Sequence, residues 1–334
     1  MGQAKVRVGV IGAAGFIGSG HLHRLATAVD GAYPTAVYDV KRERLEPHAE
    51  RYGVKIFDSA DELIASEDVD AVLIASWDAT HAAFTKQCIE AGKPVFCEKP
   101  LATTLEDCQS IVEAEKRAGK PLVQVGFMRR FDPDYRKIKE ILRSGELGAP
   151  LMAHCISRTP KIASGFTDSM QVTNIAIHEI DVMRWLLDEP IVKGQMIYGR
   201  PTGFAEEGLH DPQLALMWSK SGCLIDVECA ANSYYGYEIQ CEIVCEKGTI
   251  RLPDPPAPIV RSRLLCATEV MDDWSERFPK AYQAELQHWI DVIRGLRTEY
   301  GPGSEDGYAA CAVADAMIRS QATGLPEQVT GCGQ

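Results

Sequence analysis

The sequence lacks the short motifs that mark several large classes of enzyme. It has no CxxC pair, no HExxH helix, no GxSxG elbow and no GxxxxGK[ST] loop. These absences argue against a thiol–disulfide oxidoreductase, a zinc peptidase, a serine hydrolase and a P-loop nucleotidase. The pair His21 and His23 does not have the spacing of a metal motif, so we predict no metal site.

Long apolar runs are missing as well. The longest of them, such as residues 71–75, are far shorter than the ~20 residues of a membrane-spanning helix. The N-terminus shows no signal-peptide pattern and reaches strand-like sequence by Val6. We therefore expect a cytoplasmic protein without a membrane partner.

Basic residues are in the minority. Lys and Arg number 35 against 47 for Asp and Glu, a formal net charge of −12. A surface of this sign repels phosphate backbones, so nucleic acid is not expected as a partner. The 334 residues are 46% hydrophobic and 25% charged, which is typical of a globular protein with two domains. The 11 cysteines are scattered and odd in number, which favours reduced, mostly buried thiols.

Two different patterns of secondary structure follow one another along the chain. Residues 1–126 alternate between short apolar strands and longer helical segments, which is typical of right-handed βαβ units around a buried parallel sheet. After that comes a periodic helix over 172–187, a run of strands over 192–268 and two closing helices. The predicted fold class is α/β, with a parallel-sheet domain over 1–126 and a domain with a mostly antiparallel sheet over 127–334.

A glycine-rich loop joins the first strand to the first helix. It reads GAAGFIG, with Gly12, Gly15 and Gly18 spaced as GxxGxxG. The first glycine permits a tight turn, the second lets the backbone approach a pyrophosphate, and the third lets the helix pack closely on the strand. The start of the helix, with Phe16 and Ile17, presents N–H groups to phosphates. We predict a dinucleotide-binding loop; the alternative is a purely structural turn.

An acidic residue ends the second strand, where a dinucleotide site places one. Asp39 lies 21 residues beyond Gly18. A carboxylate there accepts hydrogen bonds from the adenosine ribose hydroxyls and repels a 2′-phosphate, which favours NAD over NADP. Lys41 and Arg42 are close by and could soften this preference, so NADP stays possible; the alternative is that both are solvated turn cations.

Two charged residues end the fifth strand. Glu98 and Lys99 follow the apolar residues 95–97 and precede Pro100. The carboxyl ends of central parallel strands face the ligand crevice of an open α/β sheet. A lysine in that place can donate a hydrogen bond to a substrate hydroxyl and tune its proton. The alternative is a solvated pair at the end of a strand.

Four longer stretches are more specific than any of these motifs alone. They are FCEKPLATT at residues 96–104, VQVGFMRR at 123–130, HEIDV at 178–182 and YGYEIQCEIV at 235–244. With them the chain resembles, over nearly its whole length, the Gfo/Idh/MocA family of sugar and polyol oxidoreductases, and most closely its inositol-oxidising members. The resemblance implies an N-terminal Rossmann domain, a C-terminal α/β domain with a large open sheet, and a homo-oligomer, often a tetramer, built on that sheet.

The resemblance also implies roles for single residues. Lys99 would lie where nicotinamide and substrate meet, and His178 would be the catalytic acid and base. Imidazole titrates near neutral pH, as a base for alcohol oxidation should, and Asn174 lies one helical turn before it on the same face. The cofactor crevice would be lined by Ser76, Trp77, His81 and Glu98, and the substrate would contact Arg129, Ser157, Asn174, Tyr235 and Tyr237.

The chain departs from the family pattern near the polyol. Inositol-oxidising members usually carry Asp at the position of Asn174, and commonly His, Asn and Thr where this chain has Ser157, Thr159 and Ile175. An asparagine can bind a hydroxyl, but it can neither take up a proton nor stabilise an imidazolium by charge. Loss of that carboxylate should lower the basicity of His178.

We interpret the sequence as an NAD-dependent oxidoreductase. It would move a hydride between a cyclic polyol, myo-inositol or an isomer, and the nicotinamide, giving a keto-inositol. One alternative is the same fold acting on another sugar or keto-sugar. The other is a catalytically weak NAD-binding sensor, for which Asn174 is the support in the sequence.

Overall fold

A computed structural model describes residues 4–254 and 257–331. The chain divides into two units, Met1–Met128 with Lys280–Cys311, and Arg129–Pro279 with Ala312–Gln334. The first boundary is close to the predicted one at 126/127. The segment Lys280–Cys311, however, was expected in the C-terminal domain and packs with the N-terminal unit. The cause is apolar burial, because Leu286, Trp289 and Ile290 are part of the N-terminal core.

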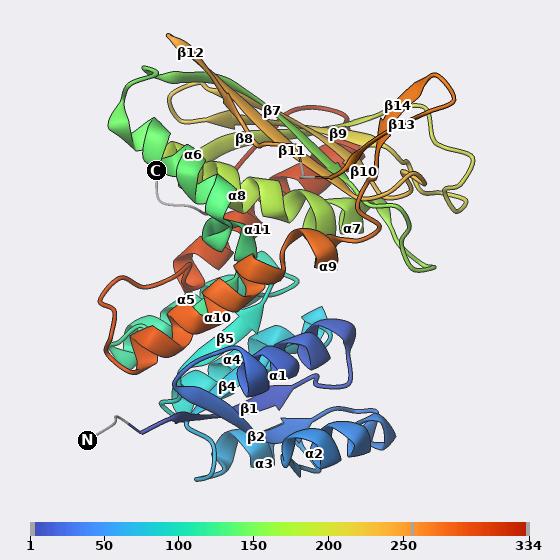
Figure 1. The fold of residues 1–334 in the computed structure, drawn as a ribbon. Coiled ribbons are helices and arrows are strands. Elements are labelled where there is room, and N and C mark those ends of the chain that lie inside the picture. Colours follow the sequence, from blue (N-terminus) through green and yellow to red (C-terminus); the bar gives the residue numbers. More distant parts are fainter. Residues whose placement is uncertain (1–3, 255–256, 332–334) are drawn as a thin grey trace. The chain divides into compact units, whose positions relative to one another are not determined.

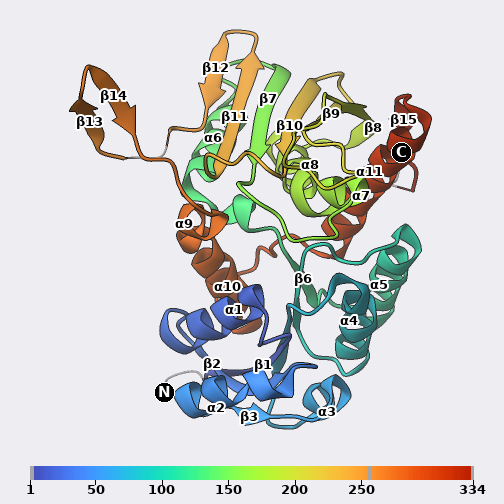
Figure 2. The same ribbon diagram turned by 90° about the vertical axis from the view of Figure 1, so that its right-hand side faces the viewer.

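The N-terminal unit contains a six-stranded parallel sheet (Figures 1 and 2). Its order, β3-β2-β1-β4-β5-β6, is that of a Rossmann fold, and the direction of the connections reverses between β1 and β4. Ligands bind such sheets outside the carboxyl ends of the strands at this reversal. The strands are β1 (Val6–Ile11), β2 (Ala32–Tyr38), β3 (Lys55–Ile56), β4 (Ala71–Ile74), β5 (Val95–Glu98) and β6 (Val123–Gly126).

Helices cover both faces of this sheet. On one face Arg24 lies over the ring of Tyr282, so the first helix contacts the helix that returns from late in the sequence. The α5 helix begins where Thr104 accepts a hydrogen bond from the Asp107 amide and ends at Gly119 in the left-handed conformation. The helices are α1 (Phe16–Thr27), α2 (Glu46–Tyr52), α3 (Ala60–Ala65), α4 (His81–Glu90), α5 (Leu105–Ala118), α10 (Pro279–Ile293) and α11 (Ser304–Thr323), of which α11 continues into the second unit.

The C-terminal unit is built on a seven-stranded sheet ordered β12-β11-β7-β10-β9-β8-β15. Among the described strands of this sheet, only the β7–β10 pair is parallel, so the predicted mostly antiparallel sheet is confirmed. A separate hairpin of β13 and β14 was not predicted. The strands are β7 (Pro150–Arg158), β8 (Ile191–Tyr198), β9 (Gln213–Ser219), β10 (Leu224–Ala230), β11 (Glu238–Cys245), β12 (Gly248–Arg251), β13 (Ile259–Ser262), β14 (Leu265–Thr268) and β15 (Glu327–Gln328).

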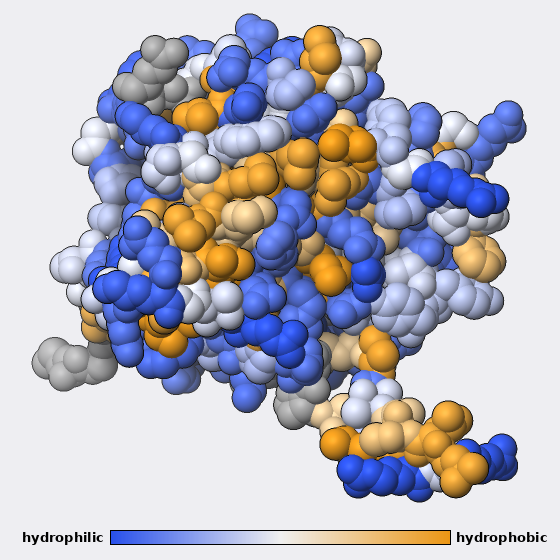
Figure 3. All heavy atoms as spheres, turned by 90° about the horizontal axis from the view of Figure 1, so that it is seen from above, coloured by the Kyte–Doolittle hydropathy of each residue, from blue (hydrophilic) through white to orange (hydrophobic). Residues whose placement is uncertain are grey.

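The two faces of the seven-stranded sheet differ. Along β7 the side chains of Ala153 and Cys155 are buried, whereas His154 between them is exposed. The buried face is covered by helices, and apolar side chains gather over the centre of the open face (Figures 1 and 3). The helices of this unit are α6 (Pro133–Ser144), α7 (Asp168–Met170), α8 (Ile177–Leu187) and α9 (Trp274–Arg277).

The predicted helix over 172–187 is interrupted. Between α7 and α8 the segment Gln171–Ala176 is a π-helical turn, so the regular α spacing begins only at Ile177. Such turns insert one extra residue into the hydrogen-bonding repeat and are frequent at functional sites. The predicted helix over 172–187 is therefore present, but its first turn is π-helical, which was not foreseen because apolar periodicity does not distinguish the two hydrogen-bond patterns.

The described thiols are free. All of them except that of Cys266 are buried, which confirms the expected reduced and mostly buried cysteines for this part of the chain. Within residues 4–254 and 257–331, no helix combines the length and apolar character needed to cross a membrane. The cytoplasmic location stays a prediction.

Candidate active site

The loop between β1 and α1 depends on its glycines. Gly12 has φ of +85°, and a Cβ there would lie 2.4 Å from the carbonyl oxygen of Ala75. A Cβ at Gly18 would lie 2.1 Å from the carbonyl oxygen of Gly12. At Gly15 the nearest atom would be 3.3 Å away, so a side chain there would fill the surface of the loop rather than collide within it. The first and third glycines therefore hold strand and helix together, and the second keeps the loop open.

The start of α1 suits an anion. Its cap, Gly15, supplies no side-chain hydrogen bond, and the first turn has no acidic residue. Phe16 is 69% exposed and Ile17 is partly exposed, so the helix begins at the surface. Backbone N–H groups and the helix dipole favour negative charge at this position. The loop thus fits the pyrophosphate of a dinucleotide, as its sequence predicts.

The carboxylate of Asp39 is fixed beside this loop. One oxygen accepts a hydrogen bond from the Ala14 amide at 3.0 Å, and the other accepts one from the Lys41 amide at 2.9 Å. These bonds hold a negative charge at the end of β2, next to the glycine turn. The geometry supports the predicted preference for NAD, because a 2′-phosphate brought to this place would meet a fixed anion.

Removing this charge should relax the choice of cofactor. For Asp39→Asn we expect the ratio of kcat/KM with NAD to kcat/KM with NADP to fall at least about fivefold, since unit charges ~4 Å apart repel by ~1 kcal/mol or more. Asparagine keeps an acceptor for the Ala14 amide, which separates loss of charge from loss of loop structure. A wild-type protein that prefers NADP would contradict the assignment.

His81 lies beneath the strand ends rather than at their surface. It is 1% exposed, and its ring nitrogens lie 2.7 Å from the Pro100 carbonyl oxygen and 3.1 Å from that of Ser76. Burial lowers the pKa of His81, but Cys97 and the Pro100 carbonyl raise it more, to about 10. A protonated ring donates to both carbonyls, so His81 joins the loop after β4 to the segment after Lys99. We therefore assign it a positioning role instead of the predicted direct contact.

The two other residues predicted after β4 differ in exposure: Ser76 is partly buried and Trp77 is exposed. The Ser76 hydroxyl is 2.6 Å from that of Thr80, which fixes the turn into α4. Trp77 is 76% exposed, although it is a large apolar side chain. An exposed indole at the carboxyl edge of a parallel sheet is placed to cover a ligand.

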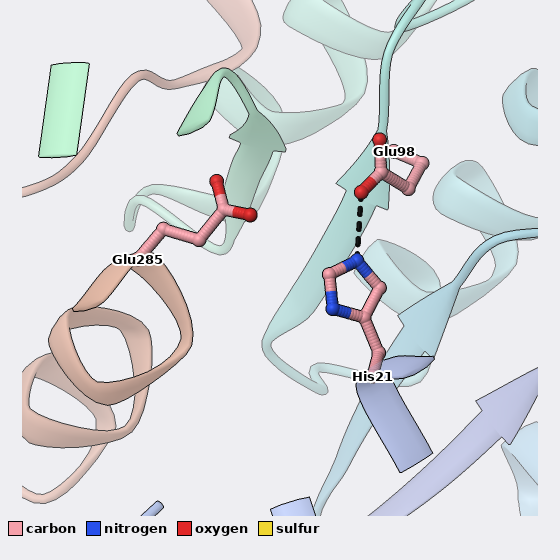
Figure 4. Close-up of side chains that lie close together, drawn as sticks. All are labelled: His21, Glu98 and Glu285. Atoms are coloured by element: carbon pink, nitrogen blue, oxygen red, sulfur yellow. Dashed lines mark hydrogen bonds and ion pairs between the residues drawn. The ribbon is translucent and has the colours of Figure 1, made fainter. Parts of the chain in front are cut away.

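Glu98 faces the interior, and Lys99 follows it. The Glu98 carboxylate is 2.7 Å from Nε2 of His21 and accepts a hydrogen bond from the Lys99 amide at 3.1 Å (Figure 4). Burial raises the pKa of Glu98, but the bond to His21 lowers it more, and the Lys99 charge acts in the same direction. Glu98 is thus an internal support for Lys99, whose side chain is half-buried. The sequence did not indicate His21 as its partner.

Three of the predicted substrate contacts in the C-terminal unit surround one acid. The Arg129 guanidinium pairs with Glu179, and both side chains are 2% exposed. Burial lowers the pKa of Arg129, but Glu179 raises it more. Ser157 lowers the pKa of Glu179 through a side-chain hydrogen bond, and Tyr237 interacts with both Arg129 and Glu179. Burial raises the pKa of Tyr237 to about 12. Arg129 is thus engaged in a buried ion pair, and its contact with the substrate stays a prediction. Sequence reasoning missed Glu179, although it directly follows His178.

The structure separates the two predicted tyrosines. Tyr237 is buried beside Arg129, but Tyr235 is 51% exposed and accepts a hydrogen bond from Arg158 at 3.0 Å. Its hydroxyl also donates to Glu238, and Arg158 bonds Glu228. These groups lie on the open face of the sheet. The prediction that both phenols meet one ligand is not supported, because Gly236, at φ of +142°, turns the chain between them.

His178 and Asn174 lie where π-helical backbone passes into α-helix. His178 is the second residue of α8 and is half-buried, and Asn174 lies within the π turn and is partly exposed. The residues on either side of His178 in α8, Ile177 and Glu179, are buried, so the packing of this short helix fixes the position of the imidazole. A half-buried histidine on such a helix is suited to general acid–base chemistry.

Comparison with known proteins identifies the family. A model of an oxidoreductase family with an NAD-binding Rossmann fold matches residues 6–127, and a model of the GFO/IDH/MocA C-terminal domain matches residues 135–251. The chain belongs to the GFO/IDH/MocA oxidoreductase family. Its N-terminal unit is the NAD-binding domain of that family, which confirms the resemblance, the fold class and the cofactor predicted from the sequence.

Curated members of the GFO/IDH/MocA family are similar to the chain over nearly its whole length. The inositol 2-dehydrogenase of Burkholderia lata is 46% identical over 97% of this chain and 96% of its own length. The inositol 2-dehydrogenase 3 of Saccharopolyspora erythraea is 48% identical over 96% of this chain and 94% of its own.

Solved GFO/IDH/MocA structures are also similar. The myo-inositol dehydrogenase from Lactobacillus casei, in complex with NAD(H) and myo-inositol, matches with a TM-score of 0.95 and 38% identity, over 99% of this chain and 98% of that one. The scyllo-inositol dehydrogenase from the same organism, with bound NAD(H) and scyllo-inositol, matches with a TM-score of 0.90 and 25% identity, over 98% and 100%.

Proposed function

We propose that this protein is an NAD-dependent inositol 2-dehydrogenase, which oxidises a ring hydroxyl of myo-inositol or of an isomer to the ketone. The observation that carries the proposal is 46–48% identity, along almost the whole chain, to relatives named inositol 2-dehydrogenase. The likeness to a structure that contains both NAD(H) and myo-inositol supports it. The glycine loop, which fits a dinucleotide, and Lys99 at the end of β5, which can bind a substrate hydroxyl, are the features that such an oxidation requires.

The residues of the chain would divide the work between binding and proton transfer. When bound, NAD⁺ supplies the hydride acceptor. The glycine loop and Asp39 hold its pyrophosphate and adenosine ribose. Lys99 donates a hydrogen bond to the oxygen of the reacting hydroxyl and stabilises its developing negative charge. His178 accepts the hydroxyl proton as general base.

The remaining predicted contacts take different parts in this proposal. Asn174, one turn before His178, binds a substrate hydroxyl. Arg129, Ser157 and Tyr237 interact with Glu179 and would hold the start of α8, and with it His178, in place. Tyr235 belongs to the charged network of the open sheet face and is left out of the substrate site.

Introducing a carboxylate at position 174 should make His178 a stronger base. For Asn174→Asp we expect the apparent pKa in the kcat/KM profile to rise, because a nearby negative charge favours protonated His178. With myo-inositol, kcat/KM should increase roughly fivefold, equivalent to ~1 kcal/mol of transition-state stabilisation. Lower activity on the preferred substrate would instead show that the amide donors of Asn174 are matched to another polyol. An unchanged profile would remove position 174 from the site.

A panel of substrates tests the proposed function. Purified protein is mixed with NAD⁺ and each inositol isomer or related sugar, and the absorbance of reduced nicotinamide is followed by stopped flow. The proposal expects the highest kcat/KM with myo-inositol or another inositol. A different best sugar would favour the alternative substrate class, and NAD binding without turnover of any member would favour the sensor.

The open sheet face is the proposed contact between copies of this chain. Neighbouring strands place Leu214, Leu216, Trp218 and Ile197 on it, each exposed in part. Apolar residues gather over the centre of this face in the space-filling view (Figure 3). Beside them lies a groove of about 500 Å³ with charged walls that include Asp226 and Arg251. We propose a homo-oligomer, and by the family resemblance a tetramer. Light scattering that finds a monomer at working concentration would contradict it.

A further inference from the structure

Three ionisable side chains meet in the interior of the N-terminal unit. His21 comes from α1, Glu98 from the end of β5 and Glu285 from α10 (Figure 4). Their exposed fractions are 0%, 6% and 0%, and their nitrogen and oxygen atoms lie within 4.8 Å of one another. The proposed function uses only Lys99, the residue that follows Glu98. It gives no reason for a second buried acid in this place.

Glu285 lacks the partners that an ionised carboxylate requires. Both of its carboxylate oxygens are buried without a hydrogen-bond partner among the described residues, and so is Nδ1 of His21. Figure 4 shows the Glu285 carboxyl group directed toward the His21–Glu98 pair. An unpaired anion in a dry interior is strongly destabilising, and the neighbouring Glu98 charge increases that cost. Burial raises the pKa of Glu285 well above its ordinary value, and Glu98 acts in the same direction.

His21 and a protonated Glu285 are complementary. Nε2 of His21 is 2.7 Å from the Glu98 carboxylate, which can only accept, so Nε2 is the donor and, in the neutral ring, Nδ1 is an acceptor. A neutral carboxyl group has the O–H donor that Nδ1 can accept. A shared metal ion fits less well. Tetrahedral zinc bonds of ~2.0–2.1 Å hold their ligand atoms about 3.3 Å apart, whereas Nε2 of His21 and the Glu98 oxygen are 2.7 Å apart.

We propose that Glu285 is a positioning residue for Lys99, and that it acts by holding a proton against the His21–Glu98 pair. The order of groups is the Glu285 carboxyl, the His21 ring, the Glu98 carboxylate and the Lys99 amide. The last two links are hydrogen bonds in the structure, at 2.7 and 3.1 Å. With Glu285 neutral, Glu98 carries the negative charge of this cluster, next to Lys99. The inference rests on the proposed role of Lys99 in the reaction.

The charges around this group come from three elements. Arg24 of α1 attracts both Glu285 and Glu98, and burial lowers the pKa of this arginine. Tyr282 of α10 has its ring 4.9 Å from the Arg24 guanidinium. Lys99 acts on Glu98 from the end of β5. A second anion at position 285 would favour the ammonium form of Lys99 and shift its titration upward.

Infrared spectroscopy can detect the proton without any substrate. The difference spectrum between wild type and Glu285→Gln at neutral pH should contain the carbonyl stretch of a protonated carboxyl group. The same band should remain in Glu98→Gln, which is the matched control because it makes the same chemical change at the ionised acid. Absence of the band from wild type, or a stoichiometric metal ion in the purified protein, would overturn the proposal.

The titration of Lys99 tests the coupling. The rate at which an amine reagent acetylates Lys99, followed by mass spectrometry, should have a lower midpoint pH in Glu98→Gln than in wild type. In Glu285→Gln, which loses no charge, the midpoint should stay where it is in wild type. A downward shift of equal size in both variants would show that Glu285 is ionised. These readouts need no turnover, so they stay decisive even if no polyol is oxidised.

Kinetics then test the positioning role. Glu285→Leu should lower kcat about tenfold, within the range for loss of a supporting polar group, and change the Kd for NAD little. Glu285→Gln should recover most of that kcat, because its amide can still donate to His21. Equal losses in the two variants would contradict positioning through the polar group. Circular dichroism identifies any variant that has failed to fold, and the infrared result on Glu285→Gln decides the proposal in that case.

Discussion

Replacing Lys99 by alanine is expected to lower kcat by ~10²–10⁴, the range for loss of a general acid–base or electrostatic group. The lysine follows the last strand residue of β5, and its amide is fixed by Glu98. Its ammonium group would stabilise charge that develops on the substrate oxygen in the transition state. Because that interaction is weaker in the ground state, the loss should fall on kcat, and the Kd for NAD should change by less than about tenfold.

Lys93 provides a matched control for Lys99. It lies just before β5, is also half-buried, and donates a hydrogen bond to the Ser66 carbonyl at 2.6 Å. The change Lys93→Ala removes the same charge from the amino end of the same strand, away from the ligand edge. Its kcat should stay within about twofold of wild type, as for most substitutions outside an active site. Similar losses of kcat in the two variants would show that Lys99 acts through stability and has no role in the reaction.

Replacing His178 by glutamine is expected to lower kcat by ~10²–10⁴ as well, because the proposed general base is removed. The imidazole lies at the start of α8, directly after the π turn Gln171–Ala176. In the pH profile of kcat/KM, the fall in activity that accompanies protonation of the general base should disappear in the variant. A variant that kept the wild-type profile and rate would exclude His178 as the base.

Two further measurements separate catalysis from structure at this position. In His178→Ala, added imidazole should restore part of kcat, since it can occupy the space of the missing ring and accept the proton. His48→Gln is the control, because His48 lies on α2, where its ring stacks on Tyr52. Its kcat should stay within about twofold of wild type. No rescue at any imidazole concentration would favour a structural role for His178.

The parts of the fold that could be predicted depend on local patterns. Alternating apolar strands and helices determine a parallel sheet, and the glycine loop and Asp39 have fixed positions within that sheet. The return of α10 to the N-terminal unit was not predicted. It depends on contacts such as that between Phe96 and Trp289, which lie far apart in the sequence. Apolar periodicity shows that a helix has a buried face, but not which core will bury it.

The candidate site shows the same division. Lys99 could be placed at a strand end because the carboxyl edge of a parallel sheet is defined by topology alone. The partners Glu179, His21 and Glu285 were missed, because a buried charged or polar side chain has no sequence signature until its partner in the fold is known. Tyr235 and Tyr237 were assigned to the substrate from the family resemblance. Gly236 turns the chain between them, and its backbone angle is not readable from sequence.

Transfer of deuterium tests the central claim most directly. Purified protein is incubated with NAD⁺ and myo-inositol that carries deuterium on the carbon to be oxidised, and both products are examined by mass spectrometry and NMR. The account predicts one deuterium at C4 of the reduced nicotinamide for each keto-inositol formed. Reduced nicotinamide without the label, or no reduced nicotinamide with any inositol, would contradict it.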